Sequence, residues 1–288
     1  MKYAYIETHR DEYAVKRMCC WLDVSRSGYY RWRDREPGKR LLQREAVRVA
    51  VNDTYYEFKR RYGAPRITLE LNEAGIPCSV NHVAELMREI GIKARNGKRF
   101  RYDPAPEASA GVAENILSRD FTATRPNEKW VSDITYIEIE EGWVYLAVIM
   151  DLFSRQIVGW SVDDQMTVDL VLDAFKMAVT RRKVEPGLLL HSDRGVQYRA
   201  WEYQEALEPK GIIQSMSRKG NCWDNAAMES FFSRLKVELV FAEQYSTLED
   251  AYSSIFEYIE VFYNRVRRHS AINYRSPTQY EQEFAQCA

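Results

Sequence analysis

The spacing of apolar residues predicts short helices at the front of the chain. Residues 13–34 are typical of two short helices: an apolar stripe of helical spacing is broken at 22–25, where Ser25 is suited to cap a second helix. A longer helix is predicted at about 40–58. We therefore expect the first part of the chain to be all-α.

A second pair of helices follows, with a sharper break between them. Apolar residues at helical spacing fill 65–74 and resume at 79–90, with Gly75 and Pro77 in the break and Gly91 at the end. This pattern is typical of a helix-turn-helix, although any pair of antiparallel helices produces it too. If the pair binds DNA, we expect contacts from the polar and basic residues Arg66, Asn81, His82, Arg88, Lys93, Arg95, Lys98 and Arg99.

Beyond residue 128 the pattern changes. Three β-rich runs joined by short turns come first, and helices and strands then alternate until two long helices. This order predicts an α/β unit, a mixed sheet flanked by helices. The strands are expected at 130–139, 143–150, 156–162, 187–192 and 212–213, and the helices at 167–182, about 200–210, about 225–241 and 247–268.

Charge separates the same two parts. Residues 1–100 contain 21 Lys and Arg against 13 Asp and Glu, whereas residues 101–288 contain 20 against 29. A basic module favours a polyanionic partner, although a solvated basic face explains it equally well. We expect a basic helix-turn-helix region at 1–100, a linker at 101–128, an α/β core at 129–241, and a C-terminal helix with a basic tail at 242–288.

Composition excludes several classes of protein. Hydrophobic residues make up 45% and charged residues 29%, which is too apolar for a disordered chain. No apolar run approaches the roughly 18 residues of a membrane span, and the first residues do not form a signal peptide. The five cysteines lack the paired spacing of a zinc site. We therefore expect a cytoplasmic protein that makes no contact with membranes.

Four residues of the α/β unit suggest chemistry. Asp133 lies within the first strand, Asp193 follows a Leu-rich strand, and Glu229 precedes Lys236 by seven residues on one face of a helix. Oxygen ligands of this kind suit Mg²⁺ or Mn²⁺, and two such ions stabilise phosphodiester displacement. The plainer alternatives are an edge-strand charge, a turn residue and one arm of a surface ion pair. Other carboxylates meet the same spacing criteria, namely Glu138, Asp151, Asp163 and Asp164.

The surrounding segments resemble a known family. Thirty-five residues separate Asp193 from Glu229, and the order Asp, Asp, Glu with a basic residue seven positions later resembles the DDE transposase and retroviral integrase superfamily. The resemblance is most specific to the OrfB transposases of the bacterial insertion-sequence three family. It rests on WVSDITY at 130–136, YLAVIMDLFSRQIVGW at 145–160, HSDRGVQY at 191–198, SMSRKGNCWDNAAMESFFSRLK at 215–236, YNRVRRHSAINYRSPTQY at 263–280 and RYGAPRI at 61–67.

The resemblance implies a fold, an activity and a set of site residues. Residues 129–241 would form an RNase H-like integrase catalytic core, in which Asp133, Asp193 and Glu229 hold two Mg²⁺ ions, for which Mn²⁺ substitutes. Water would cut a strand at the end of the element, and the released 3′-OH would attack a second phosphodiester. In this family the product is typically a circular copy of the element. Lys236 would contact DNA near the cleaved end, and further DNA contacts would come from Asn221, Trp223, Asn225, Arg265, Arg267, Arg268 and His269.

The same resemblance implies partners. These are the terminal inverted repeats and target DNA, further copies of the chain assembled on that DNA, and an upstream OrfA-type product that is often fused to this one. Val196 departs from the small polar residue expected there, and the zinc module of retroviral integrases is absent from the sequence.

Two other functions compete with a transposase. One is a non-catalytic helix-turn-helix regulator derived from a transposase, and the other is a stand-alone nuclease of RNase H type. An intact set of Asp133, Asp193 and Glu229 argues against the regulator. The basic front and the closing arginines fit the nuclease less well, because they suggest that particular DNA ends are held.

Overall fold

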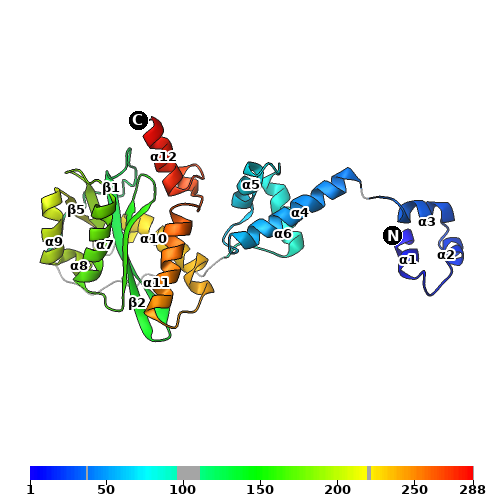
Figure 1. Cartoon of the computed structure of the whole chain (residues 1–288), viewed down its shortest axis with the longest axis horizontal. Helices are drawn as coiled ribbons and strands as arrows, with labels where there is room; N and C mark the ends of the chain where they lie inside the picture. The colour runs from blue at the N-terminus through cyan, green and yellow to red at the C-terminus, as the bar shows by residue number, and fades with distance from the viewer. Residues whose placement is uncertain (37, 96–110, 219–221, 288) are drawn as a thin grey trace. The chain divides into compact units, whose positions relative to one another are not determined.

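The computed structural model describes residues 1–36, 38–95, 111–218 and 222–287, with only the backbone of residues 222 and 223 (Figure 1). Internal contacts divide the chain into two compact units, Met1–Lys93 and Ala94–Ala288. Across the described residues, every helix is too short or too polar to cross a membrane.

The first unit begins with three short helices. They are α1 (Lys2–Thr8), α2 (Val15–Trp21) and α3 (Arg26–Arg33), and they enclose a small core of Ile6, Met18, Cys19 and Tyr29. The hydroxyl of Ser25 accepts a hydrogen bond from the backbone N–H of Gly28 at 3.0 Å. The predicted helix pair at 13–34 and its cap are therefore confirmed.

Three further helices complete this unit: α4 (Lys39–Glu57), α5 (Ala64–Glu73) and α6 (Val80–Ile90). Ser79 caps α6, and Gly91 ends it in the left-handed conformation, with φ of 79°. The Asn72 side chain accepts from the N–H of Cys78 at 2.9 Å and donates to its carbonyl at 3.2 Å, which fixes the turn between α5 and α6. The helix-turn-helix pair was therefore predicted correctly.

The second unit is built on a five-stranded mixed sheet in the order β3-β2-β1-β4-β5. Strands β1, β2 and β3 are antiparallel neighbours, whereas β4 runs parallel to β1 and β5 parallel to β4. This is the predicted mixed sheet flanked by helices. The strands are β1 (Lys129–Ile139), β2 (Gly142–Asp151), β3 (Ile157–Asp163), β4 (Leu189–Ser192) and β5 (Ile213–Met216).

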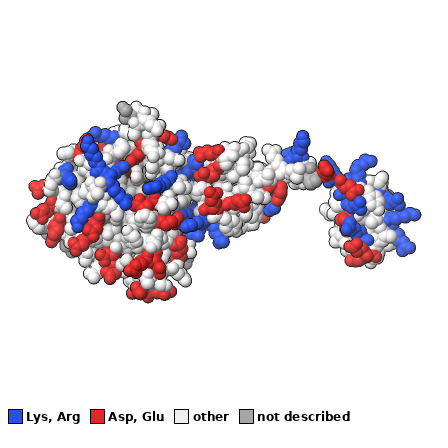
Figure 2. Space-filling view, viewed as in Figure 1, with Lys and Arg blue, Asp and Glu red and all other residues white. Residues whose placement is uncertain are grey.

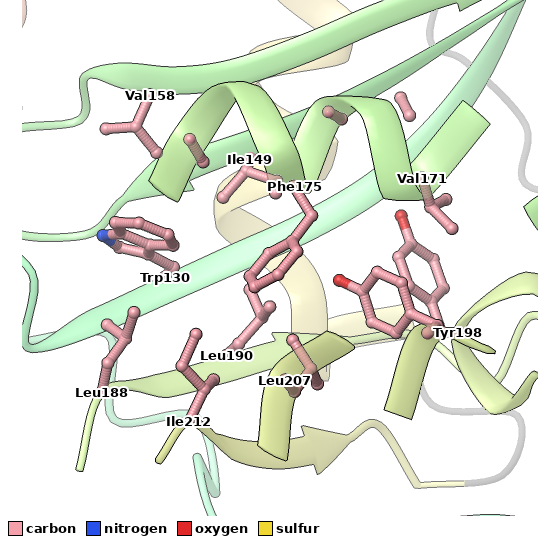
Figure 3. Packing of buried hydrophobic residues seen from close by; sticks show 14 of the residues in the cluster. Trp130, Ile149, Val158, Val171, Phe175, Leu188, Leu190, Tyr198, Leu207 and Ile212 are labelled. Carbon is pink, nitrogen blue, oxygen red and sulfur yellow. The ribbon is translucent and has the colours of Figure 1, made fainter. Parts of the chain in front are cut away.

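Helices flank the sheet. On one face α7 (Val168–Arg181) packs against β3, with Phe175 pointing into a core that also holds Trp130 and Leu190 (Figure 3). Gly159 allows this contact, because a Cβ atom there would lie 2.1 Å from the Ala174 carbonyl oxygen. The other helices are α8 (Val196–Arg199), α9 (Trp201–Leu207), α10 (Ala226–Glu238), α11 (Leu248–Phe256), which continues as a π-helix over Glu257–Tyr263, and α12 (Pro277–Cys287).

Two segments differ from the prediction. Residues 111–128, expected to belong to a linker, pack on the sheet unit: the N–H groups of Ile116 and Leu117 donate to the Ser215 hydroxyl, and Leu117 is buried. The expected basic tail instead ends in α12, whose Tyr280 and Phe284 rings contact Phe153. In both places the contacts involve one buried side chain, Leu117 or Phe153, and periodicity alone does not reveal them.

Candidate active site

Asp133 and Asp193 are held by neighbouring parallel strands. The β1–β4 ladder pairs Lys129 with Leu189 and Val131 with His191, so each residue pairs with the one sixty positions later. The same offset puts Asp193, the residue after β4, opposite Asp133. Adjacent strands lie about 4.8 Å apart, and equivalent positions on parallel strands present their side chains on the same face. The sequence-predicted pair is therefore brought together.

The electrostatics of the two carboxylates reflect this proximity. Burial and the negative charges of Asp193 and Glu229 raise the pKa of Asp133 well above its ordinary value, whereas the N–H of Ile134 and the charge of Lys236 oppose the rise. Burial also raises the pKa of Asp193, opposed by the Gly195 N–H, which donates to Oδ1 at 2.9 Å. Two half-buried acids that repel each other form a site that a cation would stabilise.

Helix α10 supplies the other two predicted residues. Glu229 is exposed in its first turn, and its charge acts on Asp133. Lys236 is only 5% exposed, with Nζ 4.7 Å from the centre of the Tyr136 ring. Burial lowers the pKa of Lys236 to about 8, while Asp133 opposes the shift, so the ammonium stays mostly charged at neutral pH.

The three predicted metal ligands are only partly assembled. Among the residues that the structure describes, no three His, Cys, Asp or Glu side chains are grouped closely enough to hold a metal ion. Asp133 and Asp193 supply an all-oxygen pair, and Glu229 is near enough to act on Asp133 through its charge. This donor chemistry fits a hard divalent cation such as Mg²⁺.

Asn225 connects the start of α10 to the strand that carries Asp133. Its side-chain amide donates to the Ser132 carbonyl at 3.1 Å, and the residue is 5% exposed. The sequence analysis placed Asn225 at the DNA interface. Its burial and this bond instead make it a link between α10 and β1.

Asp224 fixes the segment before α10, a role that the sequence analysis missed. Its buried carboxylate accepts from Arg119 at 2.8 Å, from Asn115 at 2.8 Å and from both the backbone and the guanidinium of Arg218. These partners hold its pKa well below the ordinary value, with Arg218 the largest cause. An acid directly before Asn225, with Arg218 six residues earlier, was the available signal, but Asn115 and Arg119 lie about a hundred residues away in sequence.

His191 is a packed histidine at the end of β4. Its Nδ1 lies 2.9 Å from the Ser215 hydroxyl and its Nε2 lies 3.1 Å from that of Ser217. Burial lowers its pKa to about 4, so the ring is neutral at pH 7. It therefore supports the strand end next to Asp193.

The predicted DNA-binding residues of the first unit lie on or near α5 and α6. Asn81, Arg88 and Lys93 are exposed, and His82 is half-buried. The Arg66 guanidinium lies over the Tyr62 ring, with 5.4 Å to its centre. These positions leave a DNA-facing role open to each of them.

Of the predicted residues after α11, Arg265 is exposed, whereas Arg267, Arg268 and His269 are buried. Arg267 is 3% exposed and forms two bonds to Glu238, at 2.6 and 2.8 Å. Arg268 donates to the Tyr274 carbonyl at 3.4 Å, and the ring of His269 packs edge-on against Tyr263. The expected DNA-facing role is thus corrected for Arg267, because its charge is neutralised inside the protein.

The remaining predicted residues are less informative. The side chain of Arg95 donates to the Glu238 carbonyl at 2.7 Å, so it is held within the second unit. Lys98, Arg99 and Asn221 lie outside the described residues, as does the side chain of Trp223.

Comparison with known proteins gives the following matches. Residues 123–222 and 210–277 each match an integrase core domain, and residues 42–100 match an HTH-like domain. The transposase InsF for insertion sequence IS3A of Escherichia coli K12 is 44% identical over 98% of both chains. A 31 kDa protein of insertion element IS600 of Shigella sonnei is 39% identical over 94% of this chain and 100% of its own. The HTLV-2 integrase catalytic core domain, in a complex with magnesium, superposes with a TM-score of 0.43 at 17% identity, covering 56% of this chain and 99% of its own.

Proposed function

The chain belongs to the transposase family of the IS3 insertion sequences, and we propose that Asp133, Asp193 and Glu229 carry its DNA cleavage and strand transfer. The observation that supports this assignment best is the proximity of Asp133 and Asp193: the β1–β4 ladder pairs residues sixty positions apart, and the charge of Asp193 acts on Asp133. Glu229 is the third member because its charge reaches Asp133 from α10. A regulator that only binds DNA would gain nothing from placing these acids together, since their repulsion is costly.

Asp133, Asp193 and Glu229 would hold two Mg²⁺ ions, with Mn²⁺ able to substitute. When bound, such ions stabilise the attacking and leaving oxygens of a phosphodiester displacement. The protein residues hold the carboxylates in place: one Asp133 oxygen accepts from the Ile134 N–H at 2.8 Å, and one Asp193 oxygen accepts from the Gly195 N–H. Each aspartate keeps a second oxygen for a cation.

The reaction consists of two displacements at phosphorus. A water oxygen replaces the 3′ oxygen at the end of the element, which leaves a free 3′-OH. That hydroxyl then attacks a second phosphodiester and releases another 3′ oxygen, so no covalent enzyme intermediate is required. The Lys236 ammonium, held beside Tyr136 and within the field of Asp133, contacts a phosphate near the cleaved end.

The DNA is held by surfaces outside the catalytic centre. In the first unit, Arg66, Asn81, His82, Arg88 and Lys93 form the interface of the helix-turn-helix, which reads the terminal inverted repeats. Arg265 adds a contact from the second unit. Lys98, Arg99, Asn221 and Trp223 stay in the proposal on the strength of the sequence alone.

Two DNA ends must meet for transposition, so further copies of the chain are expected to assemble on DNA. An upstream OrfA-type product, separate or fused, is expected to join them. Target DNA is the second substrate.

A plasmid that carries both ends of the element tests the assignment. With Mg²⁺ and the upstream product present, the wild-type chain should release joined or circular element DNA, and Asp133→Asn should release none. Glu138→Gln is the matched control, because Glu138 is an exposed acid on the same strand. Activity of Asp133→Asn close to that of the wild type would refute the assignment.

A further inference from the structure

The first three helices form a module with the geometry of a helix-turn-helix. Only residues 22–25 separate the end of α2 from the start of α3, which is the turn length that such motifs use. Asp23 takes the left-handed conformation within this turn, with φ of 49°. Helix α1 packs against both, through Ile6 and Tyr3.

Contacts with α1 fix which side of α3 faces solvent. Tyr29 is fully buried against α1 and α2. Gly28 lies so close to Tyr3 that a Cβ atom would be 2.3 Å from the Tyr3 hydroxyl oxygen. The ring of Trp32 lies 5.9 Å from that of Tyr3. The inner side of α3 is thus occupied by the module itself.

The outer side of α3 presents a compact set of polar and basic residues. Four exposed residues lie on one side of the helix, namely Arg26, Ser27, Tyr30 and Arg31. The last three follow Arg26 by one, four and five positions, which at 3.6 residues per turn keeps them on the same side. Arginine reads guanine edges through two hydrogen bonds, and serine and tyrosine hydroxyls bond phosphates.

Charge is unevenly distributed over the module. Helices α2 and α3 contain five basic residues and no acidic one, with Lys16 and Arg17 in the first turn of α2 and the remainder on α3. The acids lie in α1 and the loops, such as Glu7, Asp11 and Glu12. In Figure 2 this module is the one at the right of the view, and blue side chains gather along its right-hand side.

We propose that α1–α3 is a second DNA-binding module, in which α3 enters the major groove of double-stranded DNA and the first turn of α2 contacts the phosphate backbone. The HTH-like match covers residues 42–100 and leaves this module out. The inference rests on the proposed function, because it assumes that the chain acts on DNA ends. The five basic residues of α2 and α3, with Asp34 at the end of α3 paired to Arg33, complement a polyanion rather than a protein surface of mixed charge.

Two linked modules imply recognition of two separate sequence blocks. Residues 34–38 join α3 to α4, and five residues span at most about 18 Å when extended. The block read by α3 therefore lies close to the block read by α6 along the same DNA. Tethering makes binding at the second block effectively intramolecular, so loss of either module should weaken the whole complex.

Selection from a pool of duplexes with a 40-base-pair random region, about four turns of DNA, tests the proposal on the full chain. The wild type should enrich two sequence blocks. Arg26→Ala/Arg31→Ala should lose one block and bind the selected duplex at least about tenfold more weakly. Asn81→Ala/His82→Ala should lose the other block.

A matched control removes two charges from the same module outside this face. Lys2→Ala/Arg10→Ala changes two exposed residues of α1 and its C-terminal loop, and it should keep both blocks. Circular dichroism and thermal melting show whether each variant is folded. The proposal is overturned if Arg26→Ala/Arg31→Ala enriches the same sequences as the wild type, or if the wild type enriches a single block that depends on α6 alone.

An assay of DNA strand joining distinguishes failure of this proposal from failure of the catalytic assignment. With a precut duplex at saturating concentration, Arg26→Ala/Arg31→Ala should still join DNA, because its carboxylates are untouched. A wild type that enriches two blocks yet joins no DNA would leave α3 as a DNA reader and overturn the catalytic proposal instead.

Discussion

Asp133 on β1 and Asp193 just after β4 are sixty residues apart, the offset of the parallel β1–β4 ladder, and the charge of Asp193 acts on Asp133. The pKa of Asp133 is raised well above its ordinary value. Burial is the largest cause of this rise, and the negative charge of Asp193 is the second. Two ionised carboxylates this close together repel each other when no cation is bound. A cation, alone or bound to a phosphate, makes the same arrangement favourable. Strand β1 holds Asp133, and the segment just after β4, fixed by the bond from the Gly195 N–H, holds Asp193 beside it.

Removing the amide of Asn225 should slow strand joining without weakening DNA binding. Asn225→Ala deletes the bond to the Ser132 carbonyl and loosens α10 against β1. Misplacement of catalytic groups by about 1 Å costs up to about 100-fold in rate. Joining rates and DNA affinity measured side by side check this prediction. An unchanged rate would show that the link does not position Glu229.

The buried pair of Arg267 and Glu238 should serve stability. Arg267→Ala leaves the buried carboxylate of Glu238 without its cationic partner, so the free energy of unfolding should fall by about 3–5 kcal/mol. Arg265→Ala is the matched control: it should change stability by less than about 0.5 kcal/mol and weaken DNA binding. Urea unfolding and DNA titration measure both effects. Wild-type stability together with lost DNA binding in Arg267→Ala would restore its DNA-facing role.

His191 should make the sheet unit sensitive to acid. Its folded pKa of about 4 is below the unfolded value of 6.5, so the unfolded chain binds more protons between these pH values and stability falls as the pH drops through that window. The loss attributable to His191 between pH 7 and pH 5 is about 2 kcal/mol. Urea unfolding at both pH values should show this extra loss in the wild type and not in His191→Gln. Equal losses in the two proteins would mean that His191 accepts a proton without penalty.

Lys236→Ala should impair DNA placement more than chemistry. A lost charge-assisted contact weakens binding of the cleaved end by about tenfold or more, whereas the carboxylates remain. Titration of a precut duplex in a joining assay should therefore show a higher half-saturating concentration and a smaller change in the maximal rate. A maximal rate as low as that of a carboxylate variant would place Lys236 among the catalytic residues.

The sequence predicted the elements better than the contacts between them. The strand that holds Asp133 follows from a run rich in β-forming residues, and the strand before Asp193 follows from a Leu-rich run. Ser25, Ser79 and Gly91 mark helix ends by local chemistry that is visible in sequence. In contrast, Asp224 accepts hydrogen bonds from Asn115 and Arg119, which lie about a hundred residues away in sequence. Only the folded chain brings these residues together.

The closing arginines illustrate the same limit. Arg265 and Arg267 are two residues apart and look alike in sequence, yet one is exposed and the other is buried against Glu238. The π-helix over Glu257–Tyr263 shifts the helical register just before them, which helical periodicity does not predict.

Strand joining on a precut element-end duplex with a free 3′-OH, in Mg²⁺ or Mn²⁺, tests the catalytic assignment most directly. Wild type, Glu229→Gln and the exposed control Glu202→Gln would be compared with the upstream product present. We expect joined products from the wild type and from Glu202→Gln, and none from Glu229→Gln, although this variant should bind the duplex as tightly as the wild type. Joining by Glu229→Gln at a rate close to that of the wild type would contradict the assignment of Glu229 as the third catalytic carboxylate.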